Sequence, residues 1–147
     1  MSPSSSTEKV VLKFSAQSGK TEVLLNCIGF YAENMPGPIM VVQPTARPMG
    51  EAFSKDRVTP MFRDTSALAG LLTDEGGRKH STNTIISKQF PGGTLSIVGA
   101  NSPSSLASRP IRLLLADEID RYTATKEGDA LSLATKRTRT FSNRKIL

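Results

Sequence analysis

The stretch from Lys13 to Thr21, with the sequence Lys-Phe-Ser-Ala-Gln-Ser-Gly-Lys-Thr, constrains the fold more than any other part of the chain. It follows a short β-branched apolar run, Val10–Leu12, and it precedes a segment from Glu22 to Ile28 whose apolar residues recur at helical spacing. This order predicts a strand, a tight turn and a helix.

Such a turn can bind phosphate. The backbone N–H groups of residues 16–21 would point at an anion beside the N-terminus of a helix, where unpaired donors and the positive end of the dipole favour it. Lys20 would reach the β and γ phosphates of ATP, the Thr21 hydroxyl would ligate Mg²⁺, and Gly19 would allow close approach of the backbone. The motif is a Walker A sequence with one departure, because Phe14 stands where its first glycine is expected.

The alternative interpretation of this turn needs no ligand. Ser18 would cap the helix and Lys20 would be solvated. The choice between the two depends on a second motif, far downstream.

That motif is the run from Ile111 to Ala116, which is mainly apolar and is followed at once by Asp117 and Glu118. Ligand sites of open α/β sheets lie beyond the carboxyl ends of the strands, so both motifs would converge at one edge. Asp117 would hold Mg²⁺ and Glu118 would polarise the water that attacks the γ-phosphate. An acidic helix start, favoured by the helix dipole, is the alternative.

The other patterns predict an α/β sandwich around a mainly parallel sheet. The nearly all-apolar run 39–43 suits a central strand buried on both faces. The middle of the chain is predicted to form a helical segment from Thr45, a short helix over Ser66–Leu72, a surface loop over 73–83 and a hairpin from 84–90 and 94–99. A helical turn is predicted after Ser102 and a helix over about 127–138. The start of a strand is predicted at 144–147, so the chain is expected to stop mid-fold.

Composition narrows the functional classes. The chain has 147 residues and a net charge of +6, which suits a polyanionic partner, while only 5% of its residues are aromatic, which leaves little for stacking on bases. One cysteine, Cys27, and one histidine, His80, give little support to a disulfide or a zinc site. No apolar run is long enough to span a membrane. Five basic residues near the end are either a solvated surface or contacts to DNA phosphates: Lys136, Arg137, Arg139, Arg144 and Lys145.

With both motifs in place, the sequence resembles the large terminase subunit of tailed bacteriophages, in its lambda-like branch. The resemblance covers nearly the whole chain from Val10 onward. The segments that carry it are Ser15–Thr21, Pro36–Pro44, Gly99–Pro103, Leu106–Pro110, Leu114–Arg121 and Asn143–Leu147.

The resemblance implies a P-loop NTPase fold, a three-layer sandwich with a mainly parallel central sheet, of the additional-strand, catalytic-glutamate type. It implies an ATPase motor that uses ATP and Mg²⁺ to move double-stranded DNA into the procapsid, in the cytoplasm of the bacterial host. The expected partners are the small terminase subunit and the portal protein, and the assembled motor is expected to be a homo-oligomer.

The resemblance also implies roles for single residues. Lys20 and Thr21 would be the Walker A pair, Asp117 the Walker B acid and Glu118 the catalytic glutamate. Arg109 matches a position where terminases can carry an arginine finger for a neighbouring subunit's ATP. The residues expected to bind the nucleotide are Ser15, Ala16, Gln17, Ser18, Gly19, Lys20 and Thr21.

The expected boundaries are a disordered lead over 1–9 and a partial ATPase domain over 10–147, without the C-terminal part of that domain or the nuclease domain, so no DNA cleavage is expected. Many relatives have a basic residue directly before the Ser-Ala-Gln segment, whereas this chain has Phe14 there and Lys13 one place earlier. Two alternatives remain: a helicase-like DNA translocase, because the sequence 117–120 resembles a DEAD-type box, and a truncated prophage relic with weak or no ATPase activity.

Overall fold

The computed structural model describes residues 4–15, 17–72 and 84–147. Its centre is a five-stranded sheet in the order β2-β3-β1-β4-β5. Parallel pairs join β1 to β3, β1 to β4 and β4 to β5, and one antiparallel pair joins β2 to β3. The predicted α/β fold with a mainly parallel sheet is therefore confirmed. The strands are β1 (Pro38–Gln43), β2 (Ser87–Phe90), β3 (Gly93–Gly99), β4 (Leu113–Ala116) and β5 (Lys145–Ile146).

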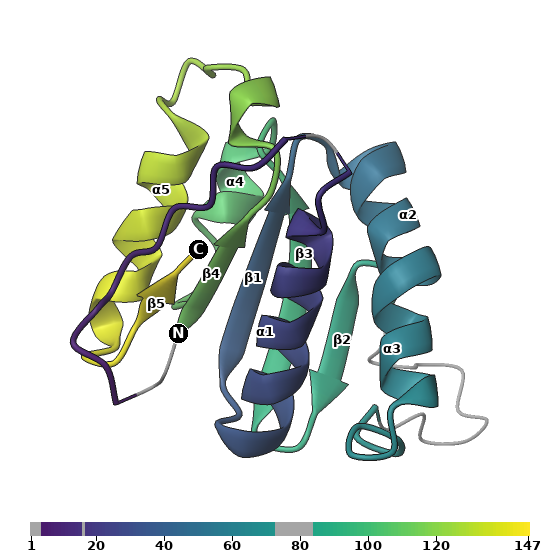
Figure 1. The fold of residues 1–147 in the computed structure, drawn as a ribbon. Helices are drawn as coiled ribbons and strands as arrows, with labels where there is room; N and C mark the ends of the chain where they lie inside the picture. The colour runs from purple at the N-terminus through teal and green to yellow at the C-terminus, as the bar shows by residue number, and fades with distance from the viewer. Residues whose placement is uncertain (1–3, 16, 73–83) are drawn as a thin grey trace.

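Helices cover both faces of this sheet and complete three layers (Figure 1). One face carries α1 (Lys20–Asn34) and a continuous helical stretch made of α2 (Glu51–Phe53), the π-helical η2 (Ser54–Val58) and α3 (Thr59–Asp64). The other face carries α4 (Pro103–Leu106) and α5 (Ala130–Lys136). Short segments of π-helix, η1 (Ala46–Gly50), and of 3-10 helix, η3 (Ile119–Arg121) and η4 (Arg137–Thr140), connect these elements.

The central strand β1 is buried on both faces, as its apolar run predicts. Ile39 and Val41 pack with α1 and α3 in one core cluster, whereas Met40 and Val42 pack with α4 and α5 in the other. Side chains alternate across a strand, so an all-apolar strand can supply two cores at once. In the observed register Val42 of β1 lies opposite Ala116 of β4, so the carboxyl ends of the two strands lie side by side.

The last strand, β5, lies between β4 and the N-terminal segment. The Val10 N–H donates to the Ile146 carbonyl at 2.9 Å, and the Ile146 N–H donates to the Glu8 carbonyl at 2.9 Å. A strand predicted over Val10–Leu12 is thus replaced by a single parallel bridge between Lys9 and Ile146, because β5 offers only two residues for pairing. β5 therefore lies between the segment that leads into the phosphate loop and the strand that precedes Asp117, which is the place of the extra strand in the expected additional-strand topology.

The segment before Val10, expected to be a disordered lead, is hydrogen bonded to β5 where the structure describes it. Lys145 is 2% exposed, and its ammonium group donates to the carbonyls of Ser5 at 2.6 Å and Thr7 at 2.8 Å. Arg144 adds an ion pair with Glu8 at 2.7 Å. These bonds anchor the chain just ahead of the loop at 13–19.

Two helix predictions need correction. Residues 66–72 form turns instead of a helix, because Gly70 takes the left-handed conformation, with φ 86°, and interrupts the helical path. The helix predicted from 127 begins only at Ala130, after Gly128 with φ 114°, and the Asp129 carboxylate accepts the Ser132 N–H as its N-cap. The loop predicted over 73–83 lies outside the described residues. Among the helices that the structure describes, none has both the length and the apolar character to cross a membrane.

Candidate active site

The Gly-Lys-Thr sequence begins α1, as the motif predicts. Gly19 precedes the helix with φ 85°, and its carbonyl accepts the Glu22 N–H at 3.0 Å and the Val23 N–H at 3.4 Å. The alternative with Ser18 as a helix cap is wrong, since the Ser18 hydroxyl donates to the Ser15 carbonyl at 2.6 Å and the capping position belongs to Gly19. A residue with a Cβ would be strained at this φ, which explains the glycine.

The N-terminus of α1 presents donors to the loop side of the site. The first helical hydrogen bonds start at Glu22, so the N–H groups of Lys20 and Thr21 stand ahead of them at the positive end of a 15-residue helix. An anion placed there is favoured by both the free donors and the dipole.

The acids Asp117 and Glu118 follow the carboxyl end of β4. The Asp117 N–H donates to the Val42 carbonyl at 3.0 Å, which extends the pairing with β1 one residue beyond the strand. Glu118 then takes a left-handed conformation, with φ 52°, and turns the chain into η3, where its carboxylate pairs with Arg121 at 2.7 Å. The chain thus bends away from the sheet directly after the two carboxylates.

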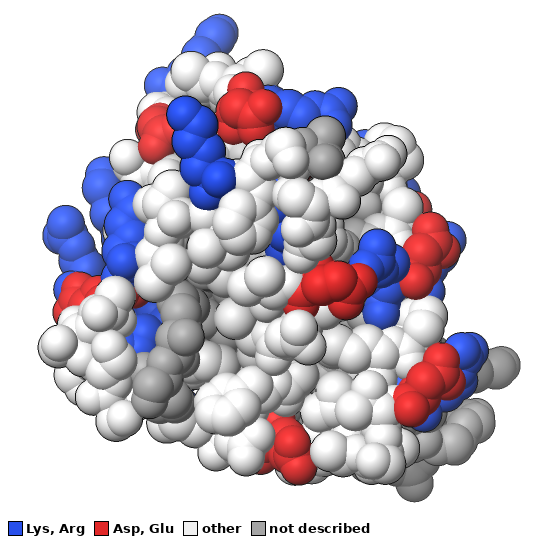
Figure 2. Space-filling model, viewed as in Figure 1, with Lys and Arg blue, Asp and Glu red and all other residues white. Residues whose placement is uncertain are grey.

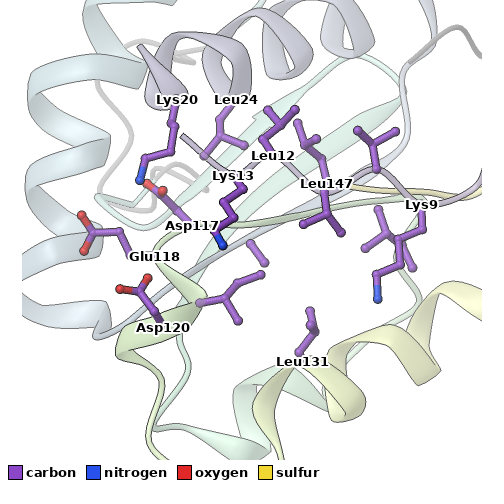
Figure 3. A pocket seen from close by; sticks show the side chains of 15 residues that line it. Lys9, Leu12, Lys13, Lys20, Leu24, Asp117, Glu118, Asp120, Leu131 and Leu147 are labelled. Carbon is purple, nitrogen blue, oxygen red and sulfur yellow. The ribbon is translucent and has the colours of Figure 1, made fainter. Parts of the chain in front are cut away.

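A cavity of about 420 Å³ joins the two motifs, a volume within the usual range of small-molecule sites. In Figure 3 the side chains of Lys20, Lys13, Asp117 and Asp120 converge on one end of it, with Glu118 beside them. The rest is mainly apolar, lined by Val10, Val11, Leu12, Leu24, Ile119, Leu131, Ile146 and Leu147. One cavity therefore combines cations, carboxylates and an apolar floor.

The structure brings together some of the predicted site residues and leaves others apart. Lys20, Asp117 and Glu118 share the cavity wall. Ser15, Gln17, Ser18, Gly19 and Thr21 belong to the adjoining loop and helix start but do not line this cavity, and Ala16 lies outside the described residues.

Arg109 lies away from this cavity. It is exposed and precedes the amino end of β4, where the Arg112 N–H pairs with the Pro38 carbonyl, whereas Asp117 and Glu118 follow the carboxyl end of the same strand. Arg109 and these two acids therefore lie at opposite ends of β4.

The donor set fits Mg²⁺ held jointly with a phosphate. Among the described residues, no three or more His, Cys, Asp or Glu side chains gather to hold a metal ion. Mg²⁺ commonly takes only one or two carboxylates and completes its shell with phosphate oxygens and waters. Asp117 lines the cavity and offers one such carboxylate, whereas Thr21 lies in the first turn of α1 and is not part of the cavity wall.

The structure also shows polar groups that the sequence patterns did not single out. Gln43 is 3% exposed, and its Nε2 donates to Asp117 Oδ2 at 3.2 Å. The Tyr122 hydroxyl donates to the Val42 carbonyl at 2.8 Å. Burial raises the pKa of the Tyr122 phenol, and the charge of Asp117 raises that pKa further. A polar residue at the carboxyl end of an otherwise apolar strand was the available signal for Gln43.

Two of the five basic residues near residue 147 have partners within the chain. Lys145 is buried against the N-terminal segment, and Arg144 pairs with Glu8. The remaining three are exposed at the end of α5 and in η4: Lys136, Arg137 and Arg139. Figure 2 shows basic side chains along the side of the molecule where α5 lies.

Comparison with known proteins gives one finding. A family model described as phage terminase large subunit gpA, ATPase domain, matches residues 1–147. No curated protein and no solved structure matches the chain.

Proposed function

Because the chain belongs to the family of phage terminase large subunit gpA ATPase domains, we propose that it binds ATP with Mg²⁺ in the cavity of Lys20 and Asp117 and hydrolyses it to drive double-stranded DNA into a procapsid. The observation that supports this most is the cavity wall that Lys20 shares with Asp117 and Glu118, residues that come from two motifs far apart in the sequence.

Lys20 and the helix start would hold the phosphates. Its ammonium group would neutralise charge on the β and γ phosphates, and the N–H groups of Lys20 and Thr21 would donate to phosphate oxygens. Ser15, Ala16, Gln17, Ser18 and Gly19 would supply the rest of the loop around them. Thr21 and Asp117 would hold Mg²⁺, which supplies charge neutralisation on the phosphate oxygens when bound.

Glu118 would act on water. Its carboxylate would accept a proton from the water that forms the new bond to the γ-phosphorus as the bond to the β–γ bridging oxygen breaks. In the structure this carboxylate pairs with Arg121, so it must turn from that partner to reach a water in the cavity. Exposure of both partners makes this ion pair weak, so the free energy needed for the turn is small.

Arg109 would serve a neighbouring subunit in a homo-oligomer. Its exposure at the far end of β4 supports a role in trans, as an arginine finger for the nucleotide of the next subunit. The small terminase subunit and the portal protein would complete the assembled motor in the cytoplasm of the bacterial host.

The test is nucleotide binding by the purified chain. A fluorescent ATP analogue should bind saturably in the presence of Mg²⁺, and Lys20→Ala should abolish this binding while the circular dichroism spectrum stays unchanged. Lys55→Ala, at an exposed position on η2, is the matched control and should bind as the wild type does. A folded wild-type chain that binds no nucleotide would overturn the proposal and would favour the relic alternative.

A further inference from the structure

Gln43 stands out because it is a buried amide at the end of an apolar strand. The rest of β1 after Pro38 is Ile39, Met40, Val41 and Val42, each at most 2% exposed, and Gln43 is 3% exposed. A buried amide without a hydrogen bond costs free energy, so its placement requires a partner. That partner is the carboxylate of Asp117.

The sheet brings these two residues side by side. β1 and β4 are parallel, and Val42 faces Ala116 in their register, so Gln43 and Asp117 occupy the next positions on neighbouring strands. A carboxylate can only accept hydrogen bonds, so the amide presents its NH₂ group to Oδ2. Among the described residues, no other side chain donates to this carboxylate, and Oδ1 is left for another ligand.

The backbone at Asp117 is fixed as well. The Val42 carbonyl accepts both the Asp117 N–H at 3.0 Å and the Tyr122 hydroxyl at 2.8 Å. Gln43 thus acts on the one part of Asp117 that remains free to rotate, its side chain.

We propose that Gln43 is a positioning residue for the metal site: its amide holds Asp117 Oδ2 so that Oδ1 faces the Mg²⁺ that accompanies the nucleotide. This inference rests on the proposed function. It assigns Gln43 no contact with the nucleotide, and its effect is confined to the Mg²⁺-dependent part of binding.

The experiment compares Gln43→Met with the wild type. Methionine keeps the length and the unbranched shape of the side chain but donates no hydrogen bond. Affinity for the ATP analogue is measured across a Mg²⁺ titration and again in excess chelator. The Mg²⁺ concentration at half-maximal binding should rise about tenfold, the effect of one hydrogen bond to a charged group, while binding in chelator should not change.

Two further variants make the result decisive. Gln43→Asn withdraws the amide by one methylene and should show the same loss, even where Gln43→Met proves unstable. Gln89→Met repeats the substitution at an exposed position on β2 and should leave the Mg²⁺ titration unchanged.

The experiment distinguishes failure of the positioning role of Gln43 from failure of the proposed function. Folded Gln43 variants with a wild-type Mg²⁺ titration, or with equal losses in Mg²⁺ and in chelator, would overturn the positioning role and leave the proposed function standing. A wild-type chain that binds no nucleotide would overturn both.

Discussion

At the scale of single residues, Glu118 should separate binding from turnover. Glu118→Gln keeps the size of the side chain but removes its basicity, so ATP binding should persist while hydrolysis falls by about 10²- to 10⁴-fold. Turnover is measured as phosphate release by an assembled motor that contains the variant, and binding by titration of the purified chain. Glu127→Gln, at an exposed position away from the cavity, is the matched control and should hydrolyse ATP normally. Unchanged turnover in Glu118→Gln would remove this residue from the mechanism.

Lys13 and Phe14 are neighbours in the sequence but differ in their position relative to the cavity. Lys13 lines the cavity and points toward its acidic end in Figure 3, whereas Phe14 is 46% exposed and lies outside the cavity wall. Lys13→Ala should therefore weaken nucleotide binding about tenfold, the effect of one charge-assisted hydrogen bond, and Phe14→Ala should change it little. Titration with the ATP analogue measures both, and a larger loss of affinity in Phe14→Ala would reverse the assignment.

At the scale of elements, the packing of α1 carries the phosphate loop. Ile28 is fully buried between α1 and the sheet, so Ile28→Ala should lower the free energy of unfolding by about 2 to 5 kcal/mol. Asn26→Ala, on the exposed side of the same helix, should stay within about 0.5 kcal/mol of the wild type. Urea denaturation compares the two, and equal effects would show that α1 does not depend on the packing of Ile28.

The turn after β4, which contains Tyr122, should make the free energy of unfolding depend on pH in alkaline solution. Tyr122 has a raised pKa, so its contribution to stability is complete below the unfolded value of 10.0 and is lost as the pH rises above it. Tyr122→Phe should be about 1 kcal/mol less stable at neutral pH, because it lacks the bond to Val42, and should lose less stability above pH 10. Urea denaturation of the wild type and of Tyr122→Phe, at neutral pH and above pH 10, measures this difference. Tyr31 and Cys27 also have raised pKa values, but both proteins contain them, so their contributions cancel in the comparison. If the free energy of unfolding fell equally with pH in the wild type and in Tyr122→Phe, this role of Tyr122 would be contradicted.

Sequence patterns predicted secondary structure best for strands whose two faces are both buried. The apolar run at 39–43 was predicted to be a central strand and the run before Asp117 to be a strand, and both predictions are confirmed. The helix over 66–72 failed because Gly70 breaks its path, which apolar spacing does not register. Gln43 was missed because its role depends on which strands are neighbours, and the direction of Lys13 could not be predicted because tertiary packing sets how a loop side chain points.

At the scale of the whole molecule, charge distribution predicts how DNA would bind. Lys136, Arg137 and Arg139 are exposed on one side, and no acidic residue follows Asp129 in the sequence. Replacing all three with Gln should weaken binding to duplex DNA and reduce the slope of log K against log salt by about 0.9 for each DNA phosphate that the variant no longer neutralises. Fluorescence anisotropy at several salt concentrations measures this slope.

The matched pair for this measurement is Lys136→Gln and Lys55→Gln, both at exposed positions but on opposite faces of the sheet. Only Lys136→Gln should reduce the slope. Equal effects would mean that the DNA responds to net charge and not to the surface at α5 and η4.

The hydrogen bonds between Lys145 and the N-terminal segment have a consequence for the order of folding. Their partners are separated by 140 and 138 residues, so these bonds are among the most non-local that this chain can form. Pairings of this kind are slow, and during synthesis β5 leaves the ribosome after the other four strands that the structure describes in this sheet. The helix α1 and the strands β1 and β3 can therefore assemble while the loop ahead of Lys20 is still untethered. The nucleotide site would then mature after this part of the sheet has formed, although its phosphate loop precedes β1 in the sequence.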